Sequence, residues 1–175
     1  PPLFVAPGPA PRYWLVGHAE WAASDAEIED LLRRPSWDPY ATVILAGKPP
    51  DAVPDAPGAA PAGDVVVLEE RSNRVVLRAR TEAPAYLVIS ATWYPGWRAE
   101  IDGQRVPLYR ANLAFQAVAI PAGGADVMLS FRPQGILAGA GISVLALTLT
   151  LALIALSAFG VRLPWRRDDP PPPLP

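Results

Sequence analysis

The residues best suited to chemistry in this sequence form an aromatic cluster near its middle. Trp93, Tyr94 and Trp97 offer flat ring faces that can stack on a sugar ring, and Arg98 and Asn112 could supply hydrogen bonds. The phase of the two tryptophans also suits a hydrophobic core, and the turn that follows Tyr94 can be simple packing at a corner. These five residues are therefore candidate ligand contacts, with core packing as the open alternative.

Residue types that carry catalysis are scarce. The single histidine, His18, has no second histidine and no cysteine with which to build a triad, because the chain contains no cysteine. Glu100 and Asp102 could work as an acid and base pair. However, strand alternation predicts that Glu100 faces solvent, and a tight turn requires Asp102. No metal-ligand spacing or phosphate-loop context is present, so we predict no catalytic residue, no metal site and no cofactor.

The charge balance bears on possible partners. The net charge is only −2, and acidic and basic residues are dispersed along the chain. A nucleic-acid-binding surface requires a concentrated basic patch, so we expect no nucleic-acid partner.

The aromatic cluster belongs to a predicted β-hairpin. Trp97–Ile101 alternates apolar and polar residues, which is the period of a half-buried strand. Asp102-Gly103 favours a two-residue type I′ turn, in which both positions have positive φ. Gln104–Tyr109 is then expected to run back as the partner strand.

Further strands are predicted on both sides of this hairpin, and short strands at intervals of about ten residues are typical of a sandwich or barrel. We therefore predict a mainly β fold, an antiparallel β-sandwich over residues 64–133. Its other strands are Val65–Glu69, Arg74–Arg80, Ala85–Trp93, Leu113–Ile120 and Ala125–Arg132.

A small α+β unit over residues 1–47 is predicted to precede the sandwich. Its elements are a strand at Tyr13–Gly17, a helix at Ser24–Arg34 that opens with a capping box, and a strand at Thr42–Ala46. Residues 48–63 are rich in Pro, Ala and Gly and predict a flexible linker.

The composition changes after the sandwich. The stretch Pro133–Val161 contains 29 residues without a charge. Because a helix needs roughly 20 apolar residues to cross the hydrocarbon core, we predict one transmembrane helix at residues 134–162. A buried helix of a soluble protein would show a polar face, which is absent here. Gly135 and Gly139 form a G-x-x-x-G pattern that suits packing on other membrane helices, or reflects the usual glycine content of such helices.

The flanking charges predict the orientation. Arg162, Arg166 and Arg167 follow the apolar stretch, with Trp165 placed as an interfacial anchor. By the positive-inside rule, the C-terminus is cytoplasmic and the β domain is extracytoplasmic. The tail at residues 163–175 is polar, then Pro-rich, and is expected to be disordered.

The order of these signals resembles a known family. The run S-A-T-W-Y-P-G-W-R-A-E-I-D-G-Q-R-V-P-L-Y-R-A-N-L-A-F-Q-A-V-A-I-P-A-G, a further strand, F-R-P and an apolar helix resemble the C-terminal region of bacterial YfhO-like membrane proteins. The upstream W-D-P-Y-A-T-V-I-L is also similar. Gln116 departs from the resemblance where a basic residue is expected, and Gly124-Ala125 where a histidine is frequent.

The resemblance implies a multi-pass parent of the glycosyltransferase-C type in the bacterial cell membrane, which transfers sugars from polyprenyl-phosphate donors to cell-envelope polymers. No catalytic residue of such proteins can be carried onto this chain, so the segment would be structural or would guide the acceptor. The implied partners are the other membrane helices of the same parent chain, membrane lipid, and a glycan or polyprenyl-linked sugar. The alternative is a single-pass, membrane-anchored carbohydrate-binding β-sandwich.

Overall fold

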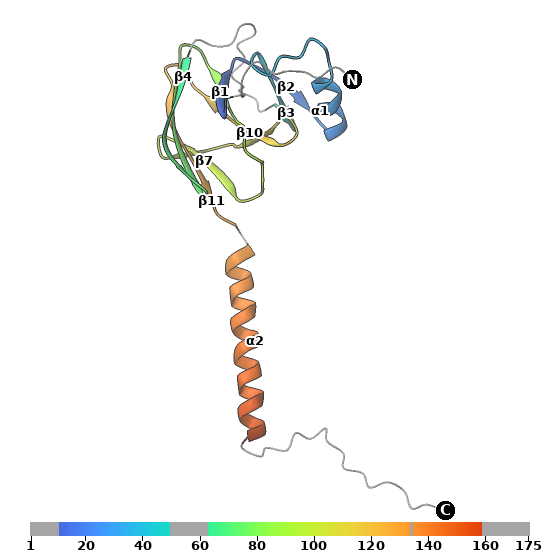
Figure 1. The fold of residues 1–175 in the computed structure, drawn as a ribbon, viewed down its shortest axis with the longest axis vertical. Helices are drawn as coiled ribbons and strands as arrows, with labels where there is room; N and C mark the ends of the chain where they lie inside the picture. Colours follow the sequence, from blue (N-terminus) through green and yellow to red (C-terminus); the bar gives the residue numbers. More distant parts are fainter. Residues whose placement is uncertain (1–10, 50–62, 134, 159–175) are drawn as a thin grey trace, which may run out of the picture. The chain divides into compact units, whose positions relative to one another are not determined.

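A computed structural model of the chain describes residues 11–49, 63–133 and 135–158 (Figure 1). The described residues form a β-sheet unit that ends at Pro133 and a separate C-terminal helix. The fold is mainly β, with two sheets, as predicted. The two units are described individually below.

The first sheet contains six strands in the order β1-β6-β10-β9-β3-β2. All neighbours in it are antiparallel except β2 and β3, which are parallel. Its strands are β1 (Tyr13–Val16), β2 (His18–Ala22), β3 (Thr42–Ala46), β6 (Ala85–Ile89), β9 (Tyr109–Ala111) and β10 (Phe115–Ile120).

The second sheet contains five antiparallel strands in the order β4-β5-β11-β7-β8. Its strands are β4 (Gly63–Arg71), β5 (Arg74–Thr81), β7 (Trp97–Ile101), β8 (Gln104–Val106) and β11 (Ala125–Phe131). Alternate residues of this sheet and of β1, β6 and β10 form the larger core, which includes Leu77, Leu87 and Leu129. These contacts confirm the predicted sandwich.

The six-stranded sheet is strongly curled. Strands β1 and β2 lie at its two opposite edges, yet only Gly17 separates them along the chain. Strand β2 also contacts β6, with which it does not pair. The sheet therefore closes on itself in the manner of a small barrel. Its inner face buries a second core, which includes Val43, Tyr86 and Val88.

Helix α1 (Asp25–Leu32) lies against the outer face of this curled sheet. Ile28 and Leu31 are buried against Ile44 of β3, whose neighbours in the strand face inwards. In Figure 1, α1 lies on one side of the six-stranded sheet, and the second sheet, with β4 and β11, lies on the other. The N-cap half of the predicted capping box is confirmed, because Ser24 Oγ accepts a hydrogen bond from the N–H of Glu27. The Glu27 carboxylate accepts from the N–H of Ala23 and not from that of Ser24.

Three details differ from the sequence expectations. The strand expected at Gln104–Tyr109 is two strands, β8 and β9, which belong to different sheets. Pro107 lies between them and cannot donate to a ladder, so the chain leaves one sheet there and enters the other. Strand β2 was not expected, because its sequence H-A-E-W-A contains no β-branched residue.

The third difference concerns the domain boundary. The strand-helix-strand unit expected at residues 1–47 is present, but β1, β2 and β3 complete the six-stranded sheet of the sandwich instead of forming a separate body. Gly63, expected in the linker, pairs with Thr81 as the first residue of β4. Residues 50–62 of the predicted linker lie outside the described residues.

The C-terminal unit contains one described helix, α2 (Gly135–Ala158). Its residues Gly139–Ala158 are long and apolar enough to cross a membrane, and none of this stretch is buried by protein. Arg162, Trp165, Arg166, Arg167 and the predicted tail at 163–175 lie outside the described residues.

Candidate functional site

The structure places two of the predicted ligand contacts at one end of the second sheet. Trp97 is half-buried, packs against the larger core, and has its ring centroid 5.3 Å from that of Phe131. Tyr94 is 60% exposed, with its ring centroid 6.1 Å from that of Phe131. One side chain therefore contributes to the core, whereas the other presents most of its ring to solvent.

Trp93 and Arg98 occupy intermediate positions. Trp93 is half-buried, and its backbone N–H donates to the carbonyl of Ala114 at 2.6 Å, just before β10. Arg98 is half-buried on β7, opposite Ser130 of β11. Of these four predicted ligand contacts, only Trp97 lines either of the two cavities described below.

Asn112 lies at a different place, in the turn between β9 and β10. It adopts a left-handed conformation with φ of 46°, and its Oδ1 accepts a hydrogen bond of 2.9 Å from the N–H of Ile44. The side chain thereby fixes the turn to β3. It also lines an apolar pocket that the sequence alone did not indicate.

This pocket lies at the mouth of the curled sheet, where β1, β3 and β10 begin. It has a volume of about 290 Å³, and its walls are mainly aromatic and apolar. Ligand sites commonly occupy the mouths of β-barrels. We refer to it as the mouth pocket, and its lining residues are Trp14, Leu32, Trp37, Pro39, Tyr40, Asn112 and Phe115.

Trp14 is the central ring of the mouth pocket. Its ring centroid lies 6.1 Å from that of Tyr40 and 6.2 Å from that of Phe115, with both contacts edge to face. The indole N–H of Trp14 donates to the carbonyl of Pro39 at 2.9 Å, and that of Trp37 donates to the carbonyl of Thr42 at 3.1 Å. Because both indole donors are satisfied by the backbone, the two rings contribute apolar surface to the pocket.

The loop between α1 and β3 holds the outer wall of the mouth pocket. Asp38 Oδ1 accepts from the N–H of Tyr40 at 2.9 Å, and the carbonyl of Asp38 accepts from the N–H of Thr42 at 2.9 Å. These bonds fix a turn that presents the Tyr40 ring, which is 42% exposed. The outer wall is thus a short turn that two hydrogen bonds to Asp38 hold in place.

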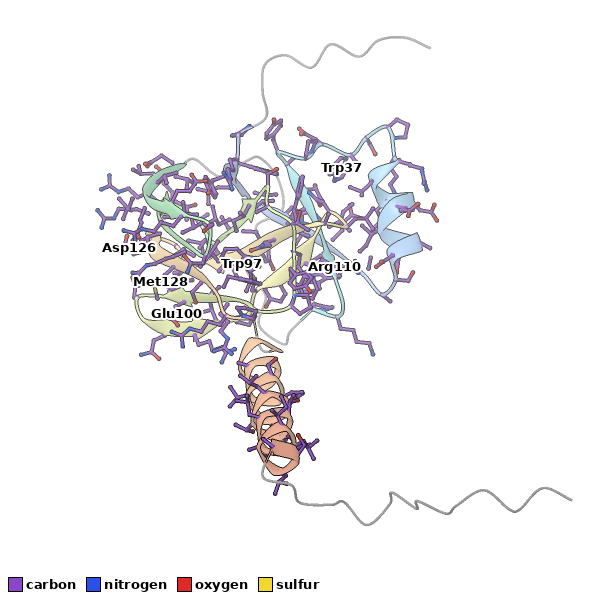
Figure 2. The ribbon with its side chains drawn as sticks, turned by 60° about the horizontal axis from the view of Figure 1, so that its bottom comes forward. Trp37, Trp97, Glu100, Arg110, Asp126 and Met128 are labelled. Carbon is purple, nitrogen blue, oxygen red and sulfur yellow. The ribbon has the colours of Figure 1, made fainter. Side chains whose placement is uncertain are left out.

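An ion pair ties α1 to the sheet beside the mouth pocket. The guanidinium of Arg110, on β9, pairs with the carboxylate of Asp25 in the first turn of α1. The hydrogen bond from Arg110 lowers the pKa of Asp25 below its ordinary value. Figure 2 shows Arg110 and Trp37 on the same side of the unit as α1, and Trp97 further towards the second sheet.

The mouth pocket is suited to binding and not to proton transfer. The described residues that line it include no carboxylate, imidazole, ammonium or guanidinium group. Asn112 brings an amide that can donate a hydrogen bond, while ring faces make up most of the wall. Such a site can hold the apolar face of a ring-shaped ligand and orient it through one or two polar contacts.

A second, smaller cavity of about 70 Å³ lies inside the sandwich between Tyr13, Trp97 and Gln116. Gln116 is buried, and its Nε2 donates to the carbonyl of Thr92 at 2.9 Å. Within the part of the chain that the structure describes, Gln116 Oε1 and Tyr13 Oη are buried without a hydrogen bond. Burial raises the pKa of Tyr13. A cavity of this size and polarity suits buried water.

No catalytic or metal constellation is formed by the described residues. Groups of three or more His, Asp or Glu side chains that could hold a metal ion are absent among them. Glu100 and Asp102, considered above as an acid and base pair, lie on and after β7, half-buried and exposed respectively. Figure 2 shows Glu100 beside Met128 on the second sheet, away from the mouth pocket.

Sequence reasoning missed four aromatic residues of the mouth pocket. The sequence did contain a signal for two of them. Trp37 and Tyr40 lie in the short P-S-W-D-P-Y loop between a helix and a strand, where the strand pattern gives no reason for large aromatic rings. Trp14 and Phe115 lie in segments whose sequence predicts ordinary strands. The missed residues are Trp14, Trp37, Tyr40 and Phe115.

One family model matches residues in both the sandwich and the helix. The model described as bacterial membrane protein YfhO matches residues 60–143, which cover β4 to β11 and the start of α2. No curated protein and no solved structure matches the chain. Five of the seven lining residues of the mouth pocket precede the matched region, so the pocket rests on the geometry of this chain. The family match and the membrane-length helix together support a membrane protein of the YfhO kind.

Proposed function

We propose that the β unit is the extracytoplasmic domain of a polytopic YfhO-like glycosyltransferase, and that it binds the glycan acceptor in the mouth pocket. The parent would transfer sugar from a polyprenyl-phosphate donor to a cell-envelope polymer. The observation that carries this proposal is a pocket of about 290 Å³ walled by four aromatic rings and one amide.

Stacking explains the choice of ligand. A pyranose has one face made of C–H groups, which fits against an aromatic ring, and its rim of hydroxyls can bond to an amide such as that of Asn112. Ring faces and an amide would hold and orient such a sugar ring. The domain would therefore guide the acceptor, while residues elsewhere in the parent carry out the transfer.

The test is saturation-transfer NMR on the 175-residue chain in lipid nanodiscs, with methyl hexosides as probes. We expect saturation of the sugar C–H protons, and a loss of affinity for Tyr40→Ser. An aromatic contact of about 0.5–1.5 kcal/mol corresponds to a roughly twofold to twelvefold weaker Kd. Tyr40 is 42% exposed, so this substitution leaves the core intact.

Tyr94→Ser is the matched control, since it removes an exposed tyrosine ring from the other aromatic cluster. Unchanged binding by Tyr94→Ser, with weakened binding by Tyr40→Ser, supports the mouth pocket. The opposite pattern would return the glycan contact to the cluster at Trp93, Tyr94, Trp97 and Arg98, and would contradict the assignment.

The rival function is a single-pass, membrane-anchored carbohydrate-binding module. It predicts the same sugar binding, so affinity does not separate the two. The protein sequence encoded upstream of this chain separates the two functions. About ten further hydrophobic segments, as the resemblance implies, would support the glycosyltransferase parent, whereas a signal peptide directly upstream would support the module.

A further inference from the structure

The turn that carries Tyr94 is fastened to the last residues of β11. The N–H of Arg132 donates to the carbonyl of Gly96 at 2.8 Å. The rings of Tyr94 and Trp97 both contact Phe131. The turn and the end of this strand therefore form one structural unit.

Gly96 shows how closely the two pieces fit. Its φ is +117°, and a Cβ placed there would lie 3.1 Å from the Phe131 ring and 3.2 Å from the carbonyl oxygen of Arg132. Only glycine combines this conformation with such an approach. Any displacement of the strand end would therefore carry the turn with it.

The Tyr94 side chain is largely exposed, so packing within the β unit does not explain why an aromatic ring stands at this position. At 60%, it is the most exposed large apolar or aromatic side chain among the described residues that precede α2. Arg132 is also exposed, and Arg98 is half-buried on the adjoining strand. The end of β11 thus presents an aromatic ring together with cationic side chains.

Chain connectivity keeps this surface near the membrane. Phe131 precedes Gly135, the first residue of α2, by four residues, and the membrane-length stretch begins four residues later at Gly139. The four residues before the helix span at most about 14 Å when fully extended, and the first helical turn adds about 6 Å. The polar layer on each side of the hydrocarbon core is several Å thick, and Tyr and Trp rings favour that layer over both water and hydrocarbon.

We propose that Tyr94, Trp97 and Phe131, with Arg98 and Arg132, form an interfacial anchor that contacts the lipid headgroup layer. The Tyr94 ring partitions into the layer, and the guanidinium groups bind lipid phosphates. The anchor holds the end of β11 and its adjoining turn in the headgroup layer. It is independent of sugar binding, because the mouth pocket shares none of these residues.

The absence of cysteine makes the test direct, because a nitroxide can be attached at one introduced cysteine in the complete chain. In nanodiscs containing anionic lipid, the label on Tyr94→Cys should show the high oxygen and low nickel-chelate accessibility of the headgroup region. The matched control is Val66→Cys, a 47% exposed position on the edge strand β4, where the label should behave as it does in water. Equal nickel-chelate accessibility at the two positions would overturn the proposal.

A second measurement places the label outside the anchor, so that the reference protein keeps all five anchor residues. With the nitroxide at Val66→Cys, adding Tyr94→Ser should shorten the rotational correlation time of the β unit, since one contact with the bilayer is lost. Adding Tyr40→Ser should leave it unchanged, because Tyr40 belongs to the mouth pocket. Equal correlation times in all three proteins would refute the anchor.

Discussion

At the residue scale, backbone conformations that few residue types tolerate mark the turns of this domain. Asp102 and Gly103 have φ of 48° and 79°, as the predicted type I′ turn requires. Asn112 and Leu113, with φ of 46° and 71°, make the turn after β9. Asparagine accepts this conformation readily, whereas leucine does so at a cost. The second turn is held by its bond to Ile44.

Gly103 gives the clearest prediction at this scale. A Cβ at Gly103 would meet nothing within 4 Å, so a substitution there perturbs the backbone alone. We expect Gly103→Val to lower the free energy of unfolding by about 1–3 kcal/mol, because a β-branched residue is disfavoured at positive φ. Gly103→Asn is the control, since asparagine tolerates the left-handed region. Chemical denaturation should rank the two, and equal losses would show that the turn conformation is not responsible.

At the element scale, α1 is attached to the sheet by two kinds of contact. Ile28 and Leu31 bury apolar surface, and the Asp25–Arg110 ion pair fixes the N-terminal end of the helix. The burial is insensitive to pH, whereas the ion pair is not. Acid should therefore weaken the second contact selectively.

The sign of that effect follows from the pKa of Asp25, which the hydrogen bond from Arg110 lowers below 3.8. A carboxyl group whose pKa is depressed on folding adds stability above the pKa of the unfolded chain and loses it as pH falls through the folded value. The urea midpoint difference between wild type and Asp25→Asn should thus be larger at neutral pH than near pH 3.

Arg110→Gln provides the matched comparison for this prediction. It removes the cation but leaves the Asp25 charge at the helix N-terminus, where the helix dipole also favours it. If Arg110 causes the shift, Arg110→Gln should lose most of the pH dependence attributed to Asp25. A midpoint difference that does not vary with pH would contradict the role of the ion pair.

Element prediction from the sequence succeeded where local signals agree. The capping box at Ser24 and the Asp102-Gly103 turn each specify their structure within a few residues. It failed at Pro107, where a single run of strand-forming residues serves two sheets. The choice of sheet depends on pairing partners distant in sequence, and no local pattern encodes these.

At the scale of the whole molecule, the sandwich and the membrane-length helix were predictable, but the curl of the six-stranded sheet was not. Closing that sheet requires β1 to pair with β6 more than sixty residues away. The mouth pocket exists only because this closure brings Trp14, Trp37 and Asn112 together. Four of the five predicted ligand contacts, by contrast, lie within the six residues from Trp93 to Arg98 and are easy to see in the sequence.

The orientation of the chain is a prediction for this scale. The arginine residues that follow the apolar stretch predict that Asp168 is cytoplasmic and that Ala125, on β11, is outside. An impermeant thiol reagent should therefore label Ala125→Cys in intact cells, and Asp168→Cys only after permeabilisation. Labelling of Asp168→Cys in intact cells would reverse the topology and contradict the extracytoplasmic location proposed for the mouth pocket.

The position of β11 in its sheet has a mechanical consequence. This strand leads directly into α2, and it is paired on both sides, with β5 and with β7. Residues Val127 to Ser130 are paired on both sides, so freeing this strand from the sheet breaks two ladders of hydrogen bonds. An edge strand such as β4 or β8 is held by one ladder only. Any load that reaches the sheet through α2 therefore enters it at a strand that two neighbours hold in place.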